Sequence, residues 1–129
     1  MRGYWREPNK HGIPAMSGIY CVYRAFYDVG RDVVVLKQLL YIGQALNANE
    51  RIAGHEMLPR WNLTLQSGET LCYSFGMVMP KDLDVCEAAM IYSNKPLFNI
   101  QYKDSYVGEP VRLSLSGQIH LLLPNISID

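Results

Sequence analysis

Two tripeptides, Gly18-Ile19-Tyr20 and Tyr41-Ile42-Gly43, each place a phenol two residues from a glycine within an apolar run. Four polar residues with distinct chemistry follow them in the chain: Arg51, His55, Glu87 and Asn99. Phenols and imidazole can handle protons, a guanidinium can bind a phosphate, and a carboxylate can hold a divalent metal. Groups of these types can together hydrolyse a phosphodiester.

Glu87 is the most informative single residue of the set. A helical wheel of the segment that starts at Leu83 places Glu87 within the apolar stripe. A carboxylate that faces a core is costly unless it is paired, hydrogen-bonded or bound to a metal. The pattern therefore leaves two interpretations: a ligand for Mg²⁺, or a partly exposed glutamate at the edge of the stripe.

Arg51 and His55 are four residues apart, which places them on one face of a predicted helix. Arginine donates two parallel hydrogen bonds to phosphate oxygens, and histidine can transfer a proton near neutral pH. The alternative is an exposed pair on a surface helix. Tyr20 and Tyr41 have the alternative of simple packing in strands, and Asn99 that of a turn residue after Pro96.

The elements that must position these residues are two strands and a helix. The β-branched and aromatic residues of 17–27 and 33–43 predict an antiparallel hairpin with a turn at 28–32. The second strand carries polar residues at Lys37 and Gln38 that could interrupt it. Asn47 is expected to cap a helix that Pro59 stops, and Gly54 marks either a close backbone approach or an early helix end.

The rest of the chain predicts a third strand over 71–79 and a helix from Asp82 to about Tyr92. Residues 61–68 read as a connector, and residues 1–16 as an N-terminal arm. Near the end, 111–115 and 118–123 predict a hairpin around a two-residue Ser116-Gly117 turn.

Composition limits the class of protein. A chain of 129 residues with 49% apolar and 19% charged residues is expected to form one soluble domain, residues 1–129. No apolar run is long enough for a membrane helix, and three unpaired-looking cysteines indicate a reducing, cytoplasmic compartment. Net charge is zero, but residues 1–60 carry eight Lys/Arg against five Asp/Glu, which could give a basic surface for phosphates.

The order of these residues closely resembles the GIY-YIG nuclease superfamily. The two tripeptides resemble its two name-giving motifs, the stretch from Glu50 to His55 its first helix, Glu87 its metal-binding glutamate, and Asn99 its later asparagine. The match covers about residues 17–100, with residues 101–129 as a C-terminal extension. The phenols are 21 positions apart, more than in many members, so the long hairpin is more similar to restriction-type members.

This resemblance implies a small α/β (α+β) sandwich with a three-stranded antiparallel sheet flanked by helices. It implies a Mg²⁺-dependent DNA endonuclease, with Mn²⁺ as a substitute metal, Glu87 as the metal ligand, and Tyr20, Tyr41, Arg51, His55 and Asn99 as catalytic residues. Tyr20 would deprotonate or position the attacking water, and Asn99 would orient substrate or support Glu87. The DNA could be duplex, single-stranded or branched, and a homodimer could cut both strands.

Two other functions are compatible with the sequence. The chain could be a nucleic-acid-binding module that kept the fold without turnover. It could also be a protein-interaction module that uses its aromatic N-terminal arm and C-terminal hairpin.

Overall fold

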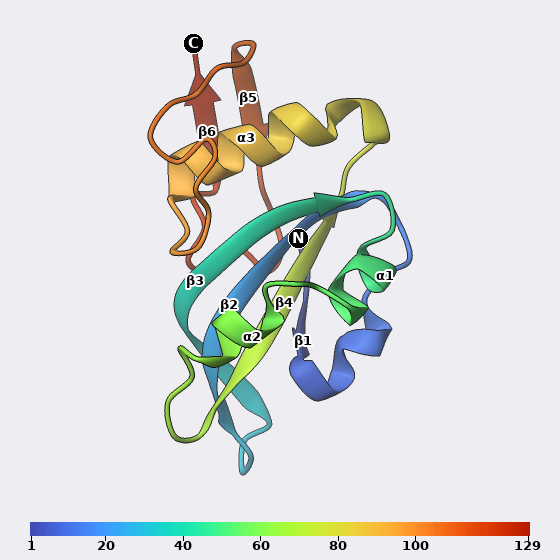
Figure 1. The fold of residues 1–129 in the computed structure, drawn as a ribbon, viewed down its shortest axis with the longest axis vertical. Helices are drawn as coiled ribbons and strands as arrows, with labels where there is room; N and C mark the ends of the chain where they lie inside the picture. The colour runs from blue at the N-terminus through green and yellow to red at the C-terminus, as the bar shows by residue number, and fades with distance from the viewer.

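The computed structural model describes residues 1–129 and shows a mixed α/β chain built on a four-stranded antiparallel sheet (Figure 1). The elements in chain order are β1 (Arg2–Arg6), η1 (Glu7–Gly12), β2 (Gly18–Asp28), β3 (Val33–Ala45), α1 (Ala48–Ala53), α2 (Leu58–Asn62), β4 (Glu69–Met77), η2 (Pro80–Asp82), α3 (Leu83–Asn94), β5 (Val111–Ser114) and β6 (Asn125–Ile128). The strand order β1-β4-β2-β3 places β2 and β4 in the interior. The predicted fold class is therefore confirmed, with one more strand in the sheet than expected.

The additional strand comes from the segment predicted to be an arm. Residues Arg2–Arg6 form β1, the edge strand that pairs with β4 on the side away from β2. The arm prediction was wrong for these residues because strand pairing with a segment about 70 residues away leaves no local signal. Pro8 lies instead in the 3-10 helix η1.

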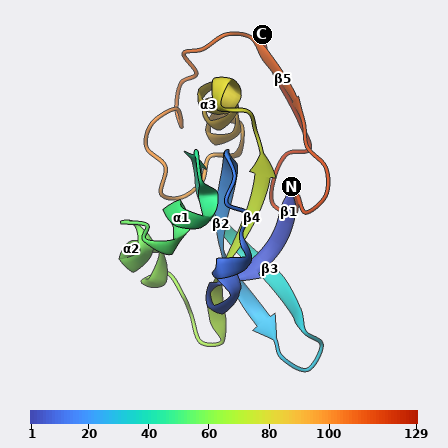
Figure 2. The same ribbon diagram turned by 90° about the vertical axis from the view of Figure 1, so that its right-hand side faces the viewer.

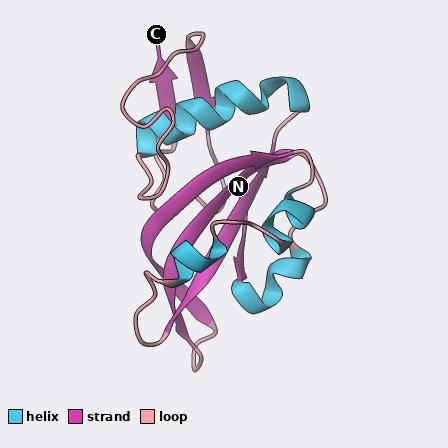
Figure 3. Cartoon of the chain, viewed as in Figure 1, coloured by secondary structure: helices cyan, strands magenta, loops and turns pink.

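Both faces of the sheet are covered, so β2 is buried over most of its length. Tyr20 and Val22 pack on one face with residues of α1 and α2, and Cys21 and Tyr23 pack on the other with α3. In Figure 2, α1 and α2 lie on one side of the sheet and β5 on the other. Figure 3 shows the far end of the β2–β3 hairpin extending beyond the helices.

The predicted hairpin is continuous but irregular. The register shifts between Arg24/Ala25 and their partners Gln38/Leu36, so Lys37 is an extra residue in β3, at the place where an interruption was expected. A second shift leaves Leu40 without a direct partner in β2. Each extra residue interrupts the alternation of β3 side chains between the two faces of the sheet.

The C-terminal hairpin was predicted with the wrong second strand. β5 matches the prediction within one residue, but its partner is β6 at Asn125–Ile128 rather than 118–123. Gly117 has a φ of +81° and a Cβ there would collide with the Met1 carbonyl oxygen, so the 116–118 turn packs on the N-terminus instead of closing a tight hairpin. None of the helices has the length and apolar character needed to span a membrane.

Candidate active site

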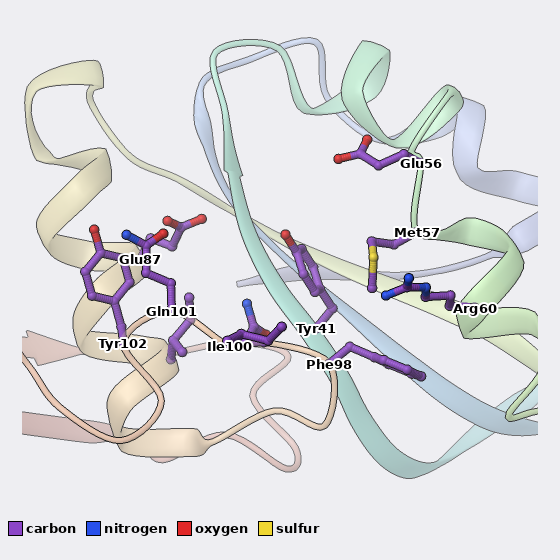
Figure 4. A pocket seen from close by; sticks show the side chains of 11 residues that line it. Tyr41, Glu56, Met57, Arg60, Glu87, Phe98, Ile100, Gln101 and Tyr102 are labelled. Carbon is purple, nitrogen blue, oxygen red and sulfur yellow. The ribbon is translucent and has the colours of Figure 1, made fainter.

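A cavity of about 260 Å³ opens over β3, between α3 on one side and the α1–α2 segment on the other (Figure 4). Three of the predicted site residues line it: Tyr41, Glu87 and Asn99. Glu56 and Arg60 line the same cavity from the opposite wall. Tyr20, Arg51 and His55 lie close behind or beside it without forming its walls.

Glu87 extends from α3 into this cavity and is half-buried. Its Oε1 accepts a hydrogen bond of 3.2 Å from the Gln44 amide, which also donates to Asp84 at 2.7 Å. Burial is the main reason why the pKa of the Glu87 carboxyl is raised, and nearby Asp84 raises it further. No lysine, arginine or histidine lies within 4.0 Å of the carboxylate, as the ion pairs of the chain all involve other residues.

The Glu87 site suits a single hard cation more than a multi-ligand metal centre. The chain has no cluster of three or more His, Cys, Asp or Glu side chains that could hold a metal. Mg²⁺ is commonly bound by one or two carboxylates and several waters, so one uncompensated carboxylate beside a cavity fits that ion. The wheel placed Glu87 inside the apolar stripe, whereas the structure places it at the stripe's margin, with the carboxylate at the cavity.

The two tripeptides meet across the β2–β3 pair, with Tyr20 directly opposite Gly43. A Cβ on Gly43 would come within 2.3 Å of the Tyr20 ring and hydroxyl, so only glycine leaves room for this phenol. Gly18 is equally constrained, because a Cβ there would lie 2.1 Å from the Gly76 carbonyl oxygen. Both glycines therefore permit a close approach, of a backbone carbonyl at Gly18 and of a side chain at Gly43.

The two phenols stack but differ in access. The Tyr20 and Tyr41 ring centroids are 6.3 Å apart with planes inclined by 26°. Tyr20 is buried, whereas Tyr41 is half-exposed and points into the cavity between Glu87 and Arg60. Burial is the largest cause that raises the pKa of both phenols, and Arg51 partly opposes it. Both are therefore neutral phenols at neutral pH.

His55 is buried and bonded through both ring nitrogens. The Met57 backbone N–H donates to Nδ1 at 3.1 Å, and Nε2 lies 2.8 Å from the Tyr20 hydroxyl oxygen. A neutral imidazole whose Nδ1 accepts must carry its proton on Nε2, so Nε2–H donates to Tyr20. Burial, followed by the charge of Arg51, lowers the pKa of His55 to about 4.

Arg51 and His55 do not share a helix face, which corrects the sequence prediction. α1 ends at Ala53, Gly54 follows as its C-cap, and His55 lies beyond it. Nothing approaches within 4 Å of a Cβ built on Gly54, so this glycine marks an early helix end rather than a close contact. Pro59 does not stop this helix; it lies in the first turn of α2, where proline is well tolerated.

Arg51 is bound by a carboxylate of its own chain. Its two terminal nitrogens donate to the two oxygens of Glu56 at 2.5 and 2.7 Å, a bidentate pair. The hydrogen bonds from Arg51 are the main cause that lowers the pKa of Glu56 to about 2. Arg51 thus lies beside the phenols with much of its charge compensated.

Asn99 has a positioning role that the sequence did not reveal. Its Oδ1 accepts from the Ile42 N–H and its Nδ2 donates to the Ile42 carbonyl, both at 2.9 Å. The side-chain amide thereby extends the hydrogen bonding of β3 next to Tyr41. No hydrogen bond joins it to Glu87, so both hydrogen-bonding groups of its side chain serve β3 instead of the expected support of that carboxylate.

Two site residues were not foreseen from the sequence. Arg60, exposed on α2, lines the cavity and pairs with no carboxylate within 4.0 Å. Trp61, expected in a connector, is fully buried with its ring centroid 4.5 Å from that of His55, and its indole N–H lacks a partner. Neither follows a local pattern: the short helix α2 brings both to the site.

Comparison of the chain with protein-family models, curated proteins and solved structures finds no match.

Proposed function

We propose that this chain is a Mg²⁺-dependent DNA endonuclease of the GIY-YIG type. One observation carries the proposal: the Glu87 carboxylate, without a cationic partner, faces the same cavity as the Tyr41 phenol. A phosphate in this cavity would meet a phenol, a guanidinium and a carboxylate suited to a cation. The paired tripeptides and their close Tyr20–Gly43 contact add support, because the motif residues meet in one place.

Glu87 would hold the metal, which supplies Lewis-acid stabilisation of the oxygens around the scissile phosphorus. The protein residues on the opposite wall provide the anion contacts. Arg60 reaches the cavity without a carboxylate partner, so its guanidinium is available to bind the non-bridging oxygens. Arg51 lies close enough that its charge partly offsets the rise in the pKa of both phenols. It would also bind the phosphate when its ion pair with Glu56 opens.

Tyr41 is the phenol best placed to position the attacking water, because it lines the cavity and its hydroxyl forms no hydrogen bond with another protein group. Tyr20, to which the sequence assigned that role, is buried behind it and accepts a hydrogen bond from His55. In this proposal the rings of Tyr20 and His55, which are bonded to each other, pack against the Tyr41 ring and hold it in place. Asn99 keeps the strand that carries Tyr41 in place.

Cleavage assays on linear duplex, single-stranded and branched DNA, with Mg²⁺ and with EDTA, test the proposal. Cleavage should need Mg²⁺ and be lost in Glu87→Ala and strongly reduced in Arg60→Ala. Glu109→Ala and Arg112→Ala remove the same charges from exposed positions outside the cavity and should cut normally. Metal-independent cutting, or full activity of Glu87→Ala, contradicts the mechanism, and binding without cutting of any substrate favours a non-catalytic module.

A further inference from the structure

Beside the cavity lies a second hollow of about 340 Å³ whose charged lining residues are all lysines: Lys37, Lys95 and Lys103. No aspartate or glutamate lines it. The chain has twelve Lys and Arg in total, and four of them pair with carboxylates within 4.0 Å. The three lysines of this hollow are among those that do not.

Each lysine reaches the hollow because of a local irregularity. Lys37 is the extra residue of a bulge in β3, a feature that redirects a side chain. Lys95 caps α3 in the left-handed conformation, with φ of 48°. Lys103 lies in the following loop, where its Nζ donates to the Leu97 carbonyl at 3.3 Å and its own carbonyl accepts from the Lys95 ammonium.

Three like charges around one hollow repel one another, and this cost is not offset by any carboxylate in the wall. Backbone carbonyls and the face of Tyr92, 4.4 Å from the Lys95 Nζ, solvate the ammonium groups only in part. An anion bound there would relieve the repulsion. The arrangement therefore favours a ligand with negative charges.

The lysine hollow and the cavity of the proposed active site are lined by neighbouring residues of one short segment. Leu97 and Lys103 line the hollow, whereas the intervening residues 98–102 line the cavity that contains Glu87. Backbone bonds from Leu97 and Phe98 to Leu39 and Leu40 hold this segment against the edge of β3. An extended polyanion can thus contact the cavity and the lysines from either side of the same segment.

We infer that Lys37, Lys95 and Lys103 form a second docking site for the phosphate backbone of a polynucleotide, a few nucleotides from the phosphate in the cavity. This inference rests on the proposed nuclease function for the identity of the polyanion. Backbone phosphates repeat at a short, regular spacing, so one strand presents several charges to both openings. Contacts of this kind fix the position of the nucleic acid without reading its sequence.

The test is metal-free binding of a fluorescent DNA duplex of about two helical turns, measured by anisotropy over a salt series. The test variant is Lys37→Gln/Lys95→Gln/Lys103→Gln. The control variant, Arg2→Gln/Lys81→Gln/Arg112→Gln, removes the same charge from three exposed residues that line neither opening. The lysine variant should bind about tenfold or more weakly, and its slope of log affinity against log salt should be shallower by about 2 to 3. The control variant should retain wild-type affinity and slope.

Equal binding by wild type and lysine variant, equal loss in both variants, or no DNA binding by wild type each overturns the inference. So does lysine-dependent binding to anionic phospholipid vesicles without binding to DNA. Cleavage assays separate the two proposals: a wild-type protein that binds DNA through these lysines but never cuts it sinks the nuclease and leaves the docking site standing. If the wild-type protein cuts DNA and the lysine variant keeps the same affinity and KM, the docking site is overturned and the nuclease proposal stands.

Discussion

Tyr20 and Gly43 lie opposite each other on β2 and β3, and a methyl group at position 43 would come within 2.3 Å of the Tyr20 hydroxyl oxygen. Tyr20 cannot easily move away, because it is stacked on Tyr41 and bonded to His55. Because Gly43 has no side chain, it leaves the space that the Tyr20 ring of the other tripeptide occupies. This contact explains in physical terms why the two tripeptides belong together.

Gly43→Ala should therefore displace the Tyr20 ring, destabilise the protein by about 1–3 kcal/mol through overpacking, and reduce cleavage at least about tenfold. Thermal melts and cleavage rates measure both effects. Gly54→Ala is the control, since that position has open space and a φ of −135°. A Gly43→Ala protein that behaves like Gly54→Ala would show that the Tyr20 position is not constrained by this glycine.

Tyr41→Phe should lower kcat about 10²-fold or more with little change in melting temperature, because it removes a cavity hydroxyl that bonds to no protein group. Tyr20→Phe should lose less activity but about 1 kcal/mol of stability, because the His55 Nε2–H loses its buried acceptor. Tyr23→Phe deletes a hydroxyl from the same strand on the other sheet face and should cut normally. If Tyr20→Phe is the slower enzyme, Tyr20 is the phenol that meets the water.

Glu87→Gln should abolish Mg²⁺-dependent cleavage and leave the metal-free protein at least as stable at neutral pH. The raised pKa means that the folded protein holds the Glu87 proton more tightly than the unfolded chain, so the ionised carboxylate costs stability above that pKa. The stability difference between variant and wild type should shrink as the pH falls and wild-type Glu87 takes up its proton.

Mg²⁺ should raise the melting temperature of wild type but not of Glu87→Gln, since a ligand stabilises only a fold that binds it. Melts with and without Mg²⁺ at several pH values decide the matter. A variant that is clearly less stable than wild type without metal would mean that Glu87 serves the fold as a bonding partner of Gln44.

Stability should fall as the pH is lowered from 6.5 towards 4, because unfolded His55 takes up a proton near 6.5 and folded His55 only near 4. The loss should approach about 3 kcal/mol below the folded pKa. Denaturant unfolding of wild type and His55→Gln over this range should show a steeper pH dependence for wild type. A His55 titration midpoint near 6.5 by NMR would contradict the neutral, Tyr20-bonded imidazole.

Glu56→Gln should release Arg51 from its bidentate partner and lower the KM for DNA by roughly two- to fivefold, the scale of an exposed ion pair. Glu50→Gln removes the same charge from the helix of Arg51 without releasing it and provides the control. Steady-state cleavage of both variants at one salt concentration tests this. A rise in KM for Glu56→Gln would instead show that Glu56 holds Arg51 in its productive orientation.

The sequence by itself determined the elements that depend on local pattern. The β2–β3 hairpin, the Asn47 cap with its bond from the Glu50 N–H, and the helix from Leu83 follow from residue type and spacing within a few positions. These features need only the free energies of short segments, which a single sequence specifies well.

The tertiary structure decided which residues share the site and what each can do there. The pairing of β1 with β4, the bonds of Asn99 to Ile42 and the placement of Arg60 and Glu87 on one cavity all join segments distant in sequence. Burial is equally non-local: the resemblance gave the water-positioning role to Tyr20, and only packing left Tyr41 at the cavity and enclosed Tyr20. Solvent access and pKa depend on every neighbour in space, so they are set by the complete fold and not by spacing along the chain.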